Sequence, residues 1–149
     1  MYSIYNDFME SEEISLTPPE YRIAMLENTK NTVLARSDAL RMRGYGNWNF
    51  DKRIEVYCEE RLPEPFVCEV VQDIHKIDFT IVHGIPVCTE RQAFTDLIND
   101  PRGDTQTLLE ALGDYYYTHN KSFSALKLDE DTEKKLRNYT EDAIHYWTY

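Results

Sequence analysis

The spacing of apolar residues changes twice along this chain of 149 residues. The first part is helical in character: Thr17-Pro18-Pro19-Glu20 is typical of a helix start and is followed by Tyr21 and Met25. From residue 53 to residue 88 polar and apolar residues alternate, which indicates half-buried strands. After Thr89 the helical spacing returns and continues to the end. This order predicts an α+β domain, with a small antiparallel or mixed β-meander between short N-terminal helices and a C-terminal run of three helices.

Local signals place the elements more closely. Ser37 is expected to cap a short helix that Gly44 ends. The dipeptide His83-Gly84 predicts a hairpin. Because Pro86 lacks an N–H group for strand pairing, the short strand 85–88 is expected either at an edge of the sheet or with Pro86 at its start. The expected strands are 53–58, 66–71, 77–82 and 85–88, and 32–35 is a brief apolar link or a fifth strand. The expected C-terminal helices are 90–99, 105–117 and 129–149.

Charge and composition exclude some classes of protein. The formal net charge is −11, which argues against a surface that binds nucleic acid as a whole, because phosphate contacts need clustered Lys and Arg. The 13% aromatic content, with 11 Tyr, is too high for a disordered acidic chain. We therefore expect one domain over residues 17–149, preceded by an acidic N-terminal arm over residues 1–16.

Several features favour the cytoplasm. No apolar run approaches the length of a membrane span, and the first ten residues have the wrong charge for a secretory signal. Cys58, Cys68 and Cys88 lie in apolar runs without metal-site or disulfide spacing, so they are expected to be reduced core residues.

One island of the sequence is cationic. Residues 31–61 hold six basic and five acidic residues, whereas the segments on both sides are acidic. Such an island is either a solvated rim or a surface that holds a phosphate or an acidic partner.

Three consecutive tyrosines, residues 115–117, are predicted to lie on one helix. Successive side chains of a helix diverge by about 100°, so at least one tyrosine is expected at the surface, where tyrosine is typical of interfaces. The predicted interaction surface comprises Arg36, Arg41, Arg43, Lys52, Arg53, Tyr115, Tyr116 and Tyr117.

Catalytic motifs are absent from the sequence. It contains no GxGxxG, GxxxxGK[ST], HExxH or GxSxG pattern, and its four histidines are scattered. Glu69 and Asp73 ahead of Lys76 faintly resemble the carboxylates of metal-dependent nucleases, although solvated loop charges are the favoured interpretation. No catalytic residue, metal or cofactor is therefore predicted.

Two segments resemble the AbiEi family of bacterial antitoxins. The segment from Thr32 to Tyr45 is similar to that family's capped S-x-A-L-x-x-x-G helix, which precedes a strand. The segment from His83 to Leu97 is similar to its G-I-P-V-T-x-x-x-R-T-x-x-D-L element, which links a hairpin to a helix. The similarity extends from about Pro18 to Tyr117. The matching positions are Ser37, Ala39, Leu40, Gly44, Gly84, Ile85, Pro86, Val87, Asp96 and Leu97, with Arg91 near the family's arginine.

The resemblance implies an antitoxin that neutralises a nucleotidyltransferase-like toxin, directly through protein contact or indirectly. The family's N-terminal winged helix has no counterpart in the roughly 30 residues before the first matching segment, which are acidic in net charge, so direct DNA binding is not expected. Asp96 is expected to pair with Arg36 or Arg91, because a half-buried carboxylate needs a partner. The alternatives are a small acidic inhibitor that mimics DNA and, third, a metal-dependent phosphoesterase.

Overall fold

A computed structural model describes residues 16–148 of the chain. The expected arm over residues 1–16 therefore lies almost wholly outside the described residues. The elements, in chain order, are α2 (Pro18–Glu27), β1 (Thr32–Leu34), α3 (Arg36–Met42), β2 (Ile54–Cys58), β3 (Phe66–Val70), η1 (Ile74–Lys76), β4 (Phe79–Val82), β5 (Ile85–Cys88), α4 (Glu90–Ile98), α5 (Thr105–Thr118), η2 (Ser124–Leu126), α6 (Glu130–His145) and η3 (Tyr146–Thr148).

The helices begin where short polar side chains can accept the free N–H groups of a first turn. Thr17 and Glu20 form a reciprocal capping box at the start of α2, in which Glu20 N donates to Thr17 Oγ1 at 3.3 Å. Thr89 Oγ1 accepts from Gln92 N at the start of α4, and Asp129 accepts from Thr132 N at the start of α6. The predicted helix starts at Thr17 and Thr89 are confirmed.

The start of α3 differs from the prediction. Ala35, and not Ser37, is the N-cap residue, and no side chain caps this helix. The chain leaves β1 through Arg36, whose φ of 52° lies in the left-handed region, so the helix begins one residue before Ser37. The Ser37 hydroxyl instead lies beside the carboxyl group of Glu55 and has a lowering effect on the pKa of that group.

The five strands form one mixed sheet in the order β3-β2-β1-β5-β4, which confirms the α+β class. The hairpin at His83-Gly84 is confirmed: both residues have positive φ, and β4 and β5 pair antiparallel. The short segment at residues 32–34 is the central strand, antiparallel to β2 and parallel to β5. The two outer strands, β3 and β4, each leave one edge unpaired within this sheet.

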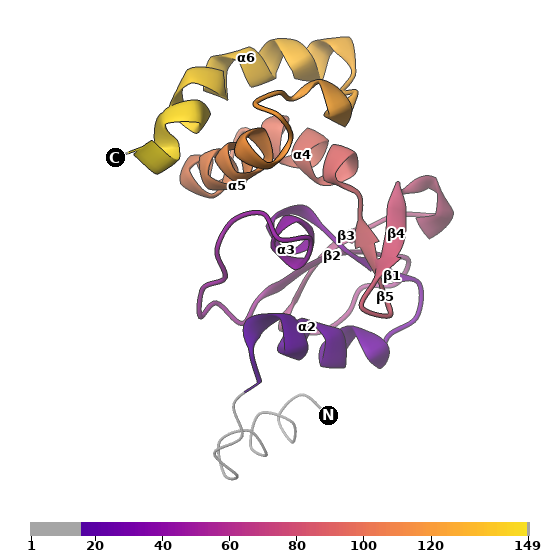
Figure 1. The fold of residues 1–149 in the computed structure, drawn as a ribbon. Coiled ribbons are helices and arrows are strands. Elements are labelled where there is room, and N and C mark those ends of the chain that lie inside the picture. Colours follow the sequence, from indigo (N-terminus) through magenta and orange to yellow (C-terminus); the bar gives the residue numbers. More distant parts are fainter. Residues whose placement is uncertain (1–15, 149) are drawn as a thin grey trace.

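The helices cover the sheet unequally. In Figure 1, α2 lies on one side of the sheet, α3 lies between the sheet and α5, and α6 forms the outermost layer next to α5. Leu34 of β1, Phe94 of α4 and Leu112 of α5 are fully buried, so one core continues from the sheet into the C-terminal helices. Cys58 and Cys88 are buried, and all three cysteines are free. None of the helices between residues 16 and 148 combines the length and the apolar character needed to cross a membrane.

Gly113 allows the end of α6 to approach α5 closely. A Cβ at this position would lie 2.8 Å from Trp147 Cδ1 and 2.9 Å from the backbone oxygen of Ala143. We therefore predict that Gly113→Ala lowers the free energy of unfolding by about 1 to 3 kcal/mol, because α6 and η3 must move away from α5.

Chemical denaturation of the wild type and the variant tests this prediction. Gly103→Ala is the matched control, because its Cβ would meet its nearest neighbours at 3.4 Å or more. Equal losses in the two variants would show that the contact between α5 and η3 does not depend on Gly113.

Candidate functional site

A polar hollow of about 270 Å³ opens between α3, the start of β2 and the turn that joins α4 to α5. Its walls carry five arginines and five carboxylates, an unusual density of charge for a chain of this size. The charged lining residues are Arg22, Arg36, Asp38, Arg41, Asp51, Arg53, Glu55, Asp100, Arg102 and Asp104.

A buried ion pair forms the floor of this hollow. Arg22 Nε donates to Asp38 Oδ1 at 3.2 Å, and each side chain is only 2% exposed. Asp38 Oδ2 also accepts from the backbone N–H of Glu55 at 2.8 Å. Arg22 further donates to the backbone oxygens of Asp51 and Arg53, and its guanidinium lies 4.8 Å from the ring centroid of Trp48. One arginine of α2 therefore fixes α3 and the chain entering β2.

A second pair closes the opposite wall. Arg36 Nη1 donates to Asp100 Oδ2 at 2.6 Å, and Arg36 Nη2 lies 3.6 Å from a carboxylate oxygen of Glu69. The first residue of α3 is thereby tied to the turn after α4. At the mouth, Arg53 and Asp51 form a more exposed pair, with Nη2–Oδ2 at 2.6 Å.

Arg41 and Glu55 are two of the charged residues in the hollow that form no such pair in the part of the chain that the structure describes. Arg41 forms no salt bridge within residues 16–148, and its Nε is buried without a hydrogen-bond acceptor there. Burial and the adjacent Asp38 carboxylate raise the pKa of Glu55 to about 7, against the lowering effects of Arg36, Arg41 and the Ser37 hydroxyl. Glu55 therefore changes its protonation state close to neutral pH.

The predicted cationic surface divides in the structure. Arg36, Arg41 and Arg53 line the same hollow, whereas Lys52 lines an adjoining one with Arg53 and Arg61. Arg43 is placed elsewhere, because it donates to the backbone oxygens of Val87 and Cys88 and to Thr80 Oγ1. Arg43 therefore lies apart from the other arginines of the predicted surface, because its guanidinium binds the carbonyl groups of β5.

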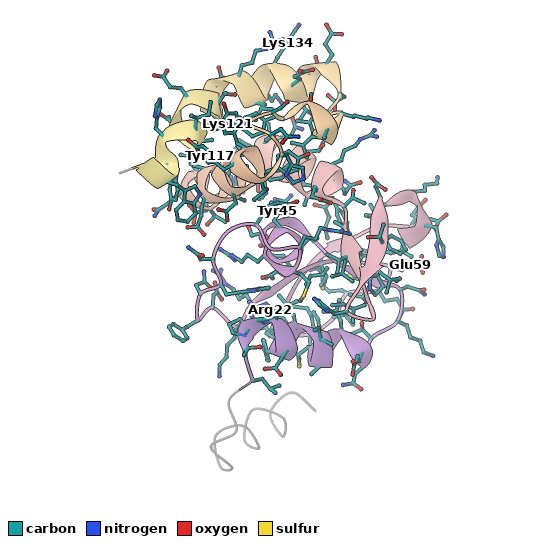
Figure 2. All side chains as sticks on the ribbon, in the orientation of Figure 1. Arg22, Tyr45, Glu59, Tyr117, Lys121 and Lys134 are labelled. Carbon is teal, nitrogen blue, oxygen red and sulfur yellow. The ribbon has the colours of Figure 1, made fainter. Side chains whose placement is uncertain are left out.

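The three tyrosines also separate. Tyr115 is buried and stacks on the His119 ring at a centroid distance of 3.7 Å, so it is a core residue. Tyr116 is partly buried and packs against Phe123, while Tyr117 is 42% exposed and donates to the backbone oxygen of Ile144. Figure 2 shows Tyr117 on α5 apart from Arg22 at α2, and none of the three tyrosines lines the polar hollow.

Asp96 has other partners than predicted. It accepts from the Tyr57 hydroxyl at 2.7 Å and from Gln92 Nε2 at 3.1 Å, and burial raises its pKa. Arg36 bonds to Asp100 instead, and Arg91 is an exposed residue of α4 that lines a different hollow. The prediction of an Asp96–arginine ion pair is wrong, because the Asp96 carboxylate is bound by the Tyr57 hydroxyl of β2 and by Gln92 instead.

The remaining motif positions have structural roles in this fold. Ala39, Leu40, Leu97, Ile85 and Val87 belong to the buried core. Gly44 and Gly84 have positive φ at turns, and Pro86 lies within β5.

The residues of the faint nuclease pattern do not gather. Glu69 is an exposed residue of β3 beside Arg36, and Asp73 caps η1 by accepting from His75 N. Over the described part of the chain, no group of three or more His, Cys, Asp or Glu side chains is placed to hold a metal ion.

Of the ten charged residues that line the hollow, sequence reasoning named Arg36, Arg41 and Arg53 as site residues and missed the other seven. Glu55 is the polar member of an alternating strand, which ordinarily indicates a solvated side chain. Arg22 follows the buried Tyr21 in α2, and only that apolar neighbour could have signalled its burial.

No family model, no curated protein and no solved structure matches this chain.

The buried ion pair gives a stability prediction. Arg22→Met keeps an apolar stem of similar length but leaves Asp38 buried without its cation, so we expect a loss of about 3 to 5 kcal/mol in the free energy of unfolding. Denaturant titration measures it. The control is Arg53→Met, whose exposed pair with Asp51 is expected to contribute less than about 1 kcal/mol. Similar losses in both variants would contradict the central role of Arg22.

Glu55 gives a pH prediction. Its pKa of about 7 in the folded protein lies above its ordinary value of 4.5, so the folded state binds more protons than the unfolded state between these values. The contribution of Glu55 to stability is therefore fully present below about pH 4.5 and is lost as the pH rises to about 7.

Relative to Glu55→Gln, the wild type should lose about 2 to 3 kcal/mol of unfolding free energy across this window. Urea denaturation at half-unit pH steps compares the two proteins. Parallel pH profiles would contradict the raised pKa of Glu55.

Proposed function

We propose that this chain is an antitoxin-like binding protein that counteracts a nucleotidyltransferase-like toxin by contacting a protein partner. The observation that carries the proposal is Phe50, whose side chain is 100% exposed on a loop that the fold holds firmly. Aromatic side chains on pre-organised loops are typical anchors of protein interfaces, because little conformational entropy is lost on binding.

The loop is anchored on both sides of Phe50. Before it, the backbone N–H groups of Gly46 and Asn47 donate to Asp114 and Glu110 of α5. After it, the backbone oxygens of Asp51 and Arg53 accept from Arg22. An apolar side chain held in water in this way favours a contact surface over a core role.

The edge strand β3 supplies a second apolar contribution near this loop. Val67 is 49% exposed and lines the hollow together with Asn49 and Asp51, the two neighbours of Phe50. We propose that Phe50 and Val67 belong to one contact surface, called the Phe50–Val67 surface below. Arg53 and Arg61 line the hollow beside Val67, and aromatic residues and Arg are the types most enriched at interface anchors.

The order of elements also supports the proposal. The segment that resembles the family's capped helix forms α3 ahead of β2, and the G-I-P-V segment forms β5 ahead of α4.

The DNA-mimic alternative has less support. On α6 the neighbours of the exposed Glu130 on the helix surface are Glu133 and Lys134, and Arg137 follows on the next turn, so this helix carries no uninterrupted row of carboxylates.

Co-expression with the product of the neighbouring gene tests the proposal. The wild type should restore growth against that toxin, and Phe50→Ser should weaken the partner's binding by about 30-fold or more and abolish rescue. Ile81→Ser is the matched control, because Ile81 is 62% exposed on β4 at the opposite edge of the sheet.

Both variants should unfold at the wild-type denaturant concentration, since neither residue is buried. Failure of the wild type to rescue growth would overturn the antitoxin proposal. Rescue by Phe50→Ser at the wild-type level would remove the Phe50–Val67 surface from it.

A further inference from the structure

We propose that the arginine-lined hollow between α3, β2 and the α4–α5 turn binds a phosphate group, either as the free anion or on a small molecule that carries it. This inference concerns a ligand site and does not rest on the proposed protein partner. It rests on two observations: several arginines line the hollow, and some of them form no salt bridge with a carboxylate within the described residues.

Arg41 is the central group of the proposed site. Its Nε is buried and has no acceptor within the described residues, although a buried N–H group without a partner costs about 1 to 3 kcal/mol. Such groups are rare in folded proteins and each requires an explanation. Arg41 as a whole is half-buried and lines the hollow, so a phosphate bound there would contact its guanidinium through the N–H groups other than Nε.

Two further guanidinium groups reach the hollow from different directions. Arg36 belongs to the first turn of α3, and Arg102 is an exposed residue of the turn between α4 and α5. Arg102 forms no salt bridge among residues 16–148. Guanidinium groups that converge from separate elements suit a tetrahedral anion with several oxygens, and Arg is the preferred residue for phosphate.

The carboxylates of the hollow are mostly engaged already. Asp38 pairs with Arg22, Asp51 with Arg53, and Asp100 with Arg36. Asp104 accepts from Gln106 N and Thr107 N at the start of α5. These contacts hold four acidic groups in place. Arg41 lies close enough to Asp38, Glu55 and Asp104 to have a lowering effect on their pKa values, but it forms no salt bridge with any of them within residues 16–148.

Glu55 is the remaining carboxyl group, and it faces Asp38, Arg36, Arg41 and Ser37. Because its pKa is about 7, it is largely neutral in mildly acidic solution and negative above neutral pH. A bound anion would disfavour the negative form, so anion binding and protonation of Glu55 should favour one another.

The experiment titrates the full chain with inorganic phosphate, pyrophosphate and adenosine monophosphate at low ionic strength, followed by amide chemical shifts. We expect saturable shifts that concentrate on residues around the hollow. Arg41→Gln should weaken phosphate binding about tenfold or more, because a hydrogen bond to a charged group is lost. Arg137→Gln, the same change of charge on an exposed residue of α6, should bind like the wild type.

Two further arms separate a specific site from general charge and from loss of folding. Glu55→Gln should bind phosphate more tightly than the wild type at pH 8, a gain that no unfolded variant gives. With sulfate, whose charge does not change between pH 6 and pH 8, wild-type affinity should rise as the pH falls while Glu55→Gln stays constant. Phe50→Ser should retain wild-type phosphate binding, which keeps this test distinct from that of the protein partner.

The outcomes decide the proposal. Tighter binding of adenosine monophosphate than of inorganic phosphate identifies a phosphorylated small molecule as the ligand, and equal binding identifies the free anion. The proposal is overturned if no probe binds saturably, if Arg41→Gln and Arg137→Gln weaken binding equally, or if the shifts lie away from the hollow.

Discussion

The buried ion pair between Arg22 and Asp38 is the interaction on which the rest of this structure depends. Neither charge reaches water, so each requires the other to offset its desolvation. The remaining hydrogen-bonding groups of the pair are used to hold backbone: Arg22 binds the carbonyls of Asp51 and Arg53, and Asp38 binds the N–H of Glu55. The same contacts that join α2, α3 and β2 therefore also fix the Phe50 loop and form the floor of the arginine-lined hollow.

This arrangement explains how a chain with a net charge of −11 presents arginines at one place. The hollow contains equal numbers of basic and acidic residues, and six of the ten are paired with one another: Arg22 with Asp38, Arg36 with Asp100, and Arg53 with its near neighbour Asp51. Each ion pair weakens the positive electrostatic potential of its arginine but holds the guanidinium group in one orientation. Arg41 and Arg102 form no salt bridge in the described part of the chain, and protonation of Glu55 leaves the hollow with one more basic than acidic charge. An anion is then recognised by pre-placed donors rather than by a broad positive surface.

The sequence predicted the elements well because their signals are local. The caps at Thr17 and Thr89, the hairpin at His83-Gly84 and the apolar faces of the last three helices all depend on residues a few positions apart. The candidate site was predicted only in part, because it depends on distant residues. Arg36, Arg41 and Arg53 cluster in the sequence, but Arg102 joins them only once α4 has packed on α3. Glu55 follows the alternation of an exposed strand residue and is enclosed because α3 and the α4–α5 turn surround that end of the sheet.

The central position of β1 has a consequence for synthesis of the chain. Leu34 of this three-residue strand pairs with Val87 of β5, while its other edge pairs with β2. A nascent chain emerging from the ribosome can pair β1 with β2 early, but the second edge of β1 stays open until β5 has been made. An open apolar edge is a template for pairing with other chains. Translation that stops between β2 and β5 would thus release a fragment prone to aggregation, and the last segment needed to complete the sheet is the hairpin of β4 and β5.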